Sequence, residues 1–100
     1  MAGNPLETLA RLDPQIVDHL KTGDQFVFAD GALSGKIKLL MALAFDAAHG
    51  ASDGVAALAQ RAMRAGATPA EIAEAVRVAW HLGGVGSLYT ASRGLKDLAG

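Results

Sequence analysis

The chain of 100 residues contains no cysteine. Disulfides, thiolate metal sites and catalysis by a thiol are therefore excluded. Aromatic residues are scarce too, at 5% of the chain, so the hydrophobic 51% consists mainly of alanine, leucine and valine. A single domain of this size buries a low fraction of its surface. We therefore expect association with further copies of the chain to supply additional burial.

The chain also lacks an excess of either charge, with nine basic and ten acidic residues. Neither sign forms a run, so nothing indicates binding to nucleic acid or to an acidic membrane surface. Arg61, Arg64 and Arg77 are expected to form surface ion pairs. No apolar run approaches the roughly 18 residues of a membrane span, and the first residues lack the features of a signal peptide. We expect a cytoplasmic protein.

Signals that start and end helices recur along the chain. Residues 4–12 and 13–23 each open on a capping side chain followed by proline, which predicts two short helices. The first begins at Asn4-Pro5 and the second ends at Gly23. Residues 26–32 are of types that favour a β-strand, but the chain contains no second such segment with which a strand could pair. We therefore expect a helical or extended connector here.

Three longer helices are predicted from Ser34 onward, followed by a last one over residues 87–98. The third helix is capped by Ser34 and ends at Gly50, the fourth is capped by Ser52 and ends at Gly66, and the fifth runs to about Leu82. The fifth begins with a capping box, Thr68-Pro69-Ala70-Glu71. The predicted buried faces are Ile37, Leu40, Met41, Ala44, Phe45 and Ala48 in the third helix, and Val55, Leu58, Ala59, Ala62 and Met63 in the fourth.

The sequence thus predicts one all-α domain over residues 1–100, a bundle of about six helices. Residues 1–33 form an N-terminal helical extension, and helices three to five form the core. A helix-turn-helix over residues 71–95 is disfavoured, because its first helix is long and its second offers only Arg93 and Lys96 as bases.

The string Ala65-Gly66-Ala67-Thr68-Pro69-Ala70-Glu71-Ile72-Ala73-Glu74-Ala75-Val76, with His81-Leu82-Gly83-Gly84 after it, resembles the carboxymuconolactone decarboxylase-like and alkylhydroperoxidase D-like (AhpD-like) family. The resemblance covers about the last two thirds of the chain. It implies this helical fold and a homo-oligomer, a trimer or a hexamer.

The resemblance also implies where catalytic residues would lie. In its redox branch, two cysteines would fall on Ala51 and Gly54, a histidine on Leu58 and a glutamate on Leu39. The decarboxylase branch keeps the histidine at the place of Leu58. All four positions are chemically inert in this chain. Since peroxide reduction in the redox branch needs an attacking and a resolving thiol, cysteine-dependent peroxidase activity is excluded.

Asp46, His49 and His81 are the candidate catalytic residues that remain. Asp46 and His49 lie three apart at the end of the third helix, on one face, so the carboxylate could orient the imidazole as a general base or metal ligand. His81 is assigned to substrate orientation. The alternative is that both histidines cap helix C-termini and that Asp46 is solvated. A joint metal site would require two helices to converge; we predict neither a metal nor another cofactor.

For several other residues the sequence allows both a structural and a functional role. Lys36 and Lys38 could hold an anionic substrate or be solvated. Trp80 and Tyr89 could line a pocket or an interface, but are expected in the core. The glycine-rich residues 83–86 follow a helix, which favours close helix packing over a phosphate loop.

Function is therefore predicted as that of a divergent carboxymuconolactone decarboxylase-like protein without thiol chemistry, either lyase-like or binding a small molecule. If it is an enzyme, it is lyase-like rather than a cysteine-dependent peroxidase. The alternative is a catalytically inactive oligomeric scaffold of the same fold.

Overall fold

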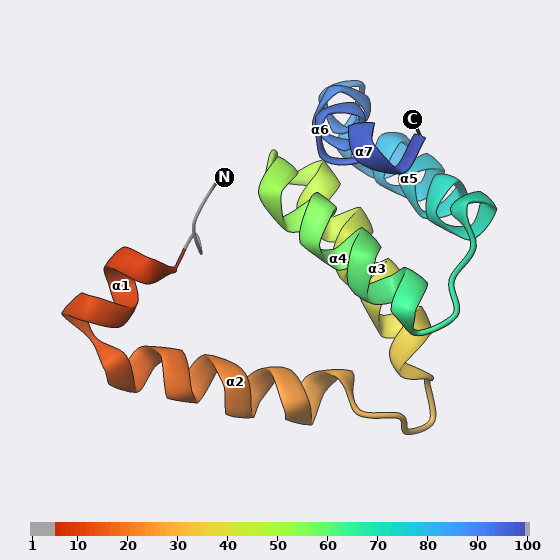
Figure 1. Ribbon diagram of the computed structural model, residues 1–100. Helices are drawn as coiled ribbons and strands as arrows, with labels where there is room; N and C mark the ends of the chain where they lie inside the picture. Colours follow the sequence, from red (N-terminus) through yellow and green to blue (C-terminus); the bar gives the residue numbers. More distant parts are fainter. Residues whose placement is uncertain (1–5, 100) are drawn as a thin grey trace.

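The structure, a computed structural model, describes residues 6–99, which are helical with short connections (Figure 1). Within this range there is no strand, which confirms the all-α prediction. No helix among the described residues is long and apolar enough to cross a membrane. The helices are α1 (Glu7–Leu12), α2 (Pro14–Phe28), α3 (Gly35–Ala48), α4 (Ser52–Arg64), α5 (Pro69–Gly83), α6 (Gly86–Gly94) and α7 (Lys96–Ala99).

Side-chain caps fix three of the helix starts, as the sequence predicts. Asp13 and Ser34 each accept a hydrogen bond from the backbone N–H three residues on, at 3.2 Å. The capping box of α5 is complete: Thr68 Oγ1 accepts from the Glu71 N–H at 3.1 Å, and Glu71 Oε1 accepts from the Thr68 N–H at 2.9 Å. The predicted cap at Asn4-Pro5 lies outside the described residues.

Three predicted boundaries are wrong. Helix α2 continues through Gly23 to Phe28, because glycine inside a helix costs only about 1 kcal/mol. Ser52 is the first residue of α4 and its side chain makes no capping hydrogen bond. The last predicted helix is divided after Gly94, where a Cβ would lie 2.7 Å from the Ser52 carbonyl oxygen. Glycine at this position lets α6 approach α4 closely.

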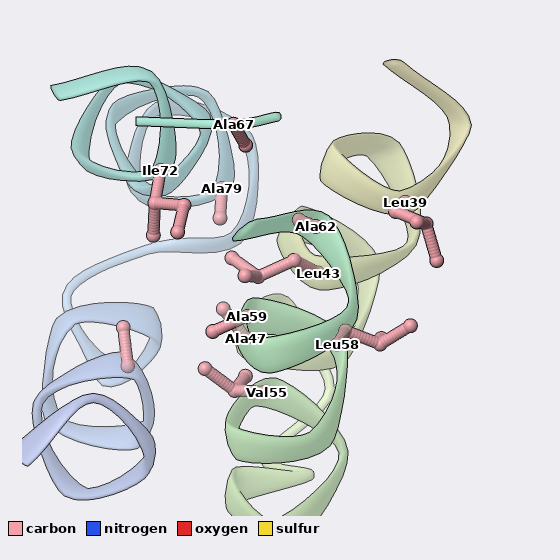
Figure 2. Close-up of a cluster of buried hydrophobic side chains, with 11 residues drawn as sticks. Leu39, Leu43, Ala47, Val55, Leu58, Ala59, Ala62, Ala67, Ile72 and Ala79 are labelled. Carbon is pink, nitrogen blue, oxygen red and sulfur yellow. The ribbon is translucent and has the colours of Figure 1, made fainter. Parts of the chain in front are cut away.

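The hydrophobic core lies between α3, α4, α5 and α6 (Figure 2). Helix α3 is central and packs more extensively against α4 and α5 than against other helices. Close packing at the end of α5 uses Gly83, where a Cβ would meet Ala48 and Ser87 at 2.8 Å. The predicted packing role of residues 83–86 is thus confirmed at Gly83, whereas a Cβ at Gly84 or Gly86 would meet nothing within 4 Å. The buried core side chains are Leu39, Leu43, Ala47, Val55, Leu58, Ala59, Ala62, Ala67, Ile72, Ala79 and Ala91.

The predicted buried face of α3 is half right: Leu40, Ala44 and Ala48 are partly buried and pack against the core, but its three largest exposed members are misplaced. Ile37, Met41 and Phe45 are 44%, 57% and 64% exposed. The cause is that α3 is apolar on nearly all sides, so its spacing alone does not select a face. The residues that it buries are Gly35, Leu39, Leu43 and Ala47.

Other predicted core side chains also lie at the surface. Trp80 and Tyr89 are 49% and 64% exposed, and Met63 of α4 is 38% exposed. The remaining predicted face of α4, from Val55 to Ala62, is buried as expected. Large apolar side chains are therefore abundant on the outside of this molecule.

Helices α1 and α2 together form an arm (residues 6–28) that extends away from the core (Figure 1). No residue of either helix is buried. The junction follows the C-terminal end of α2, where the Asp30 carboxylate accepts from the Gly35 N–H at 2.6 Å and Lys38 Nζ donates to the Ala29 carbonyl at 2.8 Å. The arm is thus anchored at one end.

Candidate functional site

An open cavity of about 1120 Å³ lies between α2 of the arm and helices α3 and α4. Its lining is mostly apolar, with Phe28 from the arm, Met41 and Phe45 from α3, and Leu58 from α4. Ligand sites in proteins are commonly apolar hollows that carry a few polar groups. We call this hollow the arm cavity. Its charged lining residues are Lys21, Asp24, Asp46 and Arg61.

Arg61 holds the two walls of the arm cavity together. Its guanidinium group donates to both carboxylate oxygens of Asp24, at 2.9 and 2.7 Å. The same guanidinium lies over the Phe28 ring, with its carbon 4.9 Å from the ring centroid. A fork of this kind fixes both orientation and distance. The surface pairing expected for Arg61 is confirmed, and it joins α4 to the arm.

Asp46 lies at the other end of the polar lining, half-buried between α3 and α4. Its carboxylate packs directly against Gly54, so a Cβ at position 54 would overlap it. Among the described residues, none forms a hydrogen bond or an ion pair with this carboxylate. Asp46 is therefore an acidic group available to a molecule in the arm cavity.

The four positions at which the resemblance implies catalytic residues fall in two places. Leu39 and Leu58 are buried at 6% and 9% exposure, on the side of the α3–α4 pair opposite Ile72 (Figure 2). Ala51 and Gly54 lie at the start of α4. Beside Gly54, the space next to its Cα is filled by the Asp46 carboxylate. The Asp46 carboxylate is thus the polar group nearest to this position.

His49 does not share the arm cavity with Asp46. Its Nδ1 lies 2.8 Å from the Phe45 carbonyl oxygen, and its ring stacks on the Phe45 ring with centroids 4.1 Å apart. It borders a second hollow of about 490 Å³ between α3 and α5, which Asp46 does not line. The structure therefore gives His49 the capping contact that was the alternative interpretation, and places it and Asp46 in the linings of different hollows.

His81 lies exposed in the last turn of α5 and lines neither of these hollows. Leu82 and Gly83, the residues after it, border the α3–α5 hollow in its place. In the part of the chain that the structure describes, no three His, Asp or Glu side chains are grouped so as to hold a metal ion. The three candidate residues are thus not brought to one place.

The two lysines considered for anion binding both have partners. Lys36 Nζ lies 3.0 Å from Glu71 Oε2, and Lys38 binds the Ala29 carbonyl. The pKa of Glu71 is lowered, chiefly by its hydrogen bond with the Thr68 N–H and also by Lys36. Lys36 therefore contributes to the joint between α3 and α5.

Sequence reasoning missed the residues that define the arm cavity. Asp24 and Arg61 are 37 positions apart, so no local spacing connects them. Phe28 was assigned to a connector, although it packs against the core. The contact between Asp46 and Gly54 likewise depends on how α3 and α4 pack, and only the small size of Gly54 could have suggested it.

Comparisons with known proteins agree with the fold. The apo crystal structure of lpg0406, a carboxymuconolactone decarboxylase family protein from Legionella pneumophila, matches with a TM-score of 0.83 and 26% identity. The match covers 94% of this chain and 84% of that protein. No curated protein matches significantly. The model of the carboxymuconolactone decarboxylase family matches residues 14–97. The chain therefore belongs to the carboxymuconolactone decarboxylase family.

Proposed function

We propose that the chain binds a mainly apolar small molecule in the arm cavity and that Asp46 acts on it as an acid–base group. The observation that carries this proposal is the half-buried carboxylate at Gly54, which has no partner among the described residues. The apolar lining from Phe28, Phe45 and Leu58 supports an apolar ligand. Lys21 offers a cation for an anionic group on it.

The chemistry that suits this arrangement is lyase-like proton transfer. A carboxylate beside an apolar surface can take a proton from carbon and return it later, since catalysis requires the base within reach of that proton. Such a reaction needs no thiol, in keeping with the lack of cysteine. Family membership supports this class of reaction, and Asp46 is the group that this chain offers for it.

A pair of tryptophan variants tests the location of the ligand. Ala57→Trp fills the arm cavity, which Ala57 lines from an exposed position on α4. Ala73→Trp places the same bulk on an exposed position of α5 and is the control. With the fluorescent apolar anion 1-anilinonaphthalene-8-sulfonate as probe, we expect at least a tenfold loss of affinity for Ala57→Trp alone. Equal affinity in both variants would place binding elsewhere.

Asp46→Asn tests the chemical role, because the amide keeps the shape and removes the basic oxygen. A substrate screen of small lactones and carboxylic acids, read by mass spectrometry, should find turnover in the native chain and a loss of at least a hundredfold in the variant. Unchanged turnover in Asp46→Asn would refute the role. The pairing of His49 with Asp46 and the orienting role of His81 stay predictions. Unchanged turnover in His49→Ala and His81→Ala would rule them out.

The second candidate is an inactive oligomeric scaffold, a trimer or hexamer. It is favoured by the inert residues at all four matched positions and by the many exposed apolar side chains. Native mass spectrometry separates the two candidates. An oligomer that retains stoichiometric extra mass supports the ligand-binding protein, whereas a bare oligomer without turnover supports the scaffold.

A further inference from the structure

The chain exposes more surface than a compact monomer of its mass. Its accessible surface is 6915 Å² at 10.2 kDa, whereas a folded monomer of that mass exposes about 5300 Å². The radius of gyration is likewise 14.0 Å, against about 13 Å for a compact domain of 100 residues. The excess of about 1600 Å² exceeds the roughly 800 Å² that each partner buries in a stable interface.

The arm carries a regular apolar stripe that accounts for part of this excess. Ile16, Leu20, Gly23 and Val27 follow one another at intervals of four, three and four residues, the spacing of a seam between two packed helices. The three large side chains are 45%, 51% and 51% exposed, and Leu20 lies at the edge of the stripe, where it also borders the arm cavity. A Cβ at Gly23 would meet nothing within 4 Å, so the space beside it is open. We call these four residues the α2 seam.

The α2 seam is complementary to itself when two copies run antiparallel. In the register that centres the pair between Leu20 and Gly23, each Leu20 faces the open position at Gly23 of the second copy. Ile16 then faces Val27 of the second copy at both ends. Large side chains opposite a small one and branched side chains opposite each other fill the contact without a gap.

We propose that α2 pairs through this seam with α2 of a second copy of the chain, antiparallel and around a two-fold axis. The arm needs such cover, because α2 buries no residue of its own and an isolated helix of 15 residues is marginally stable in water. The pairing holds α2 in place as a wall of the arm cavity. This two-fold pairing is compatible with a hexamer built from three dimers. A trimer with three-fold symmetry alone has no two-fold axis and is not compatible with it.

The first test compares charged substitutions on the two sides of α2. Val27→Asp lies in the α2 seam and does not line the arm cavity. Phe26→Asp, at a position that is 85% exposed outside the seam, is the matched control. By analytical ultracentrifugation we expect Val27→Asp to weaken association at least a hundredfold and Phe26→Asp to leave it unchanged. A native chain that is monomeric at 100 µM, or equal association of both variants, would overturn the proposal.

The second test is disulfide cross-linking. Because the chain contains no cysteine, any disulfide must form between introduced cysteines. Residues 16 and 27 are about 16 Å apart along one helix, so Ile16→Cys/Val27→Cys cannot form a disulfide within a chain. Antiparallel pairing predicts covalent dimers of this double variant on mild oxidation, and few with Ile16→Cys alone. Efficient cross-linking of Ile16→Cys alone would show a parallel pair, and an oligomer that never cross-links would use another face. Either result contradicts the proposal.

Discussion

The arm and the core of this chain are both helical, yet they are stabilised in different ways. In the core, helices α3 to α6 bury alanine, leucine, valine and isoleucine against one another. In the arm, neither α1 nor α2 buries a single residue. Both regions carry the caps and the apolar spacing that specify a helix. The difference shows that local signals decide where helices form, whereas burial decides which part of the chain is stable by itself.

The largest difference is expected for one substitution made in each region. Leu43→Ala removes a side chain with 0% exposure from α3, and we expect it to lower the free energy of unfolding by about 3 kcal/mol. Leu12→Ala removes a side chain that is 77% exposed in the arm, and we expect less than about 0.5 kcal/mol. Urea unfolding followed by circular dichroism measures both. Similar losses would mean that the arm belongs to one continuous core.

A somewhat smaller effect tests the contact between Asp46 and Gly54. Gly54→Ala should destabilise the native chain by about 2 kcal/mol, because the new Cβ overlaps the carboxylate. In an Asp46→Ala background the same change should stabilise by up to about 1 kcal/mol, since alanine is the better helix former. Chemical unfolding of the four variants gives both values. Equal effects of Gly54→Ala in the two backgrounds would show that the carboxylate lies elsewhere.

The joint between arm and core should contribute less than either of these. The carboxylate of Asp24 and the guanidinium of Arg61 are about one-third exposed, at 34% and 33%, so solvent weakens their attraction. A double-mutant cycle of Asp24→Ala with Arg61→Ala should give a coupling of less than about 1 kcal/mol. Arg64→Ala on the same helix is the control and should not couple to Asp24. A coupling above 2 kcal/mol would make this pair a principal support of the arm.

The smallest effect is expected within the core, at Glu71. Because the folded state lowers the pKa of Glu71, its contribution is present above the unfolded pKa of about 4.3. It is lost as pH falls through the lower folded value. The melting temperature of Glu71→Gln should therefore lie below that of the native chain at pH 6, with a difference that shrinks towards pH 3. Glu74→Gln on the same helix controls for the lost charge. A difference in melting temperature between Glu71→Gln and the native chain that grows as pH falls would contradict the lowered pKa of Glu71.

Much of the fold could be predicted from the sequence, because caps are local. The capping box at Thr68 and the proline after Asp13 place the starts of their helices correctly. The buried face of α3 could not be predicted, since both Leu43 and Met41 lie on apolar stripes and only packing against α4 and α5 decides between them.

The candidate site was harder to predict than the fold. Asp46 was named from the sequence, but its contact is with Gly54 on the next helix and not with His49 on its own. Asp24 and Arg61 meet only because α2 begins its course away from the core beside α4. Residues that lie far apart along the chain cannot be joined by spacing rules. The family resemblance indicated the region around Gly54, but it could not indicate that the Asp46 carboxylate packs there.

The most direct test of the division between arm and core is amide hydrogen exchange at several protein concentrations, followed by mass spectrometry of peptides. If a second copy covers the arm, protection of α2 should rise with concentration, while protection of α3, α4 and α5 stays constant. This follows because association stabilises only what it covers. An α2 helix protected as strongly as α3 at concentrations where the chain is monomeric would contradict the account.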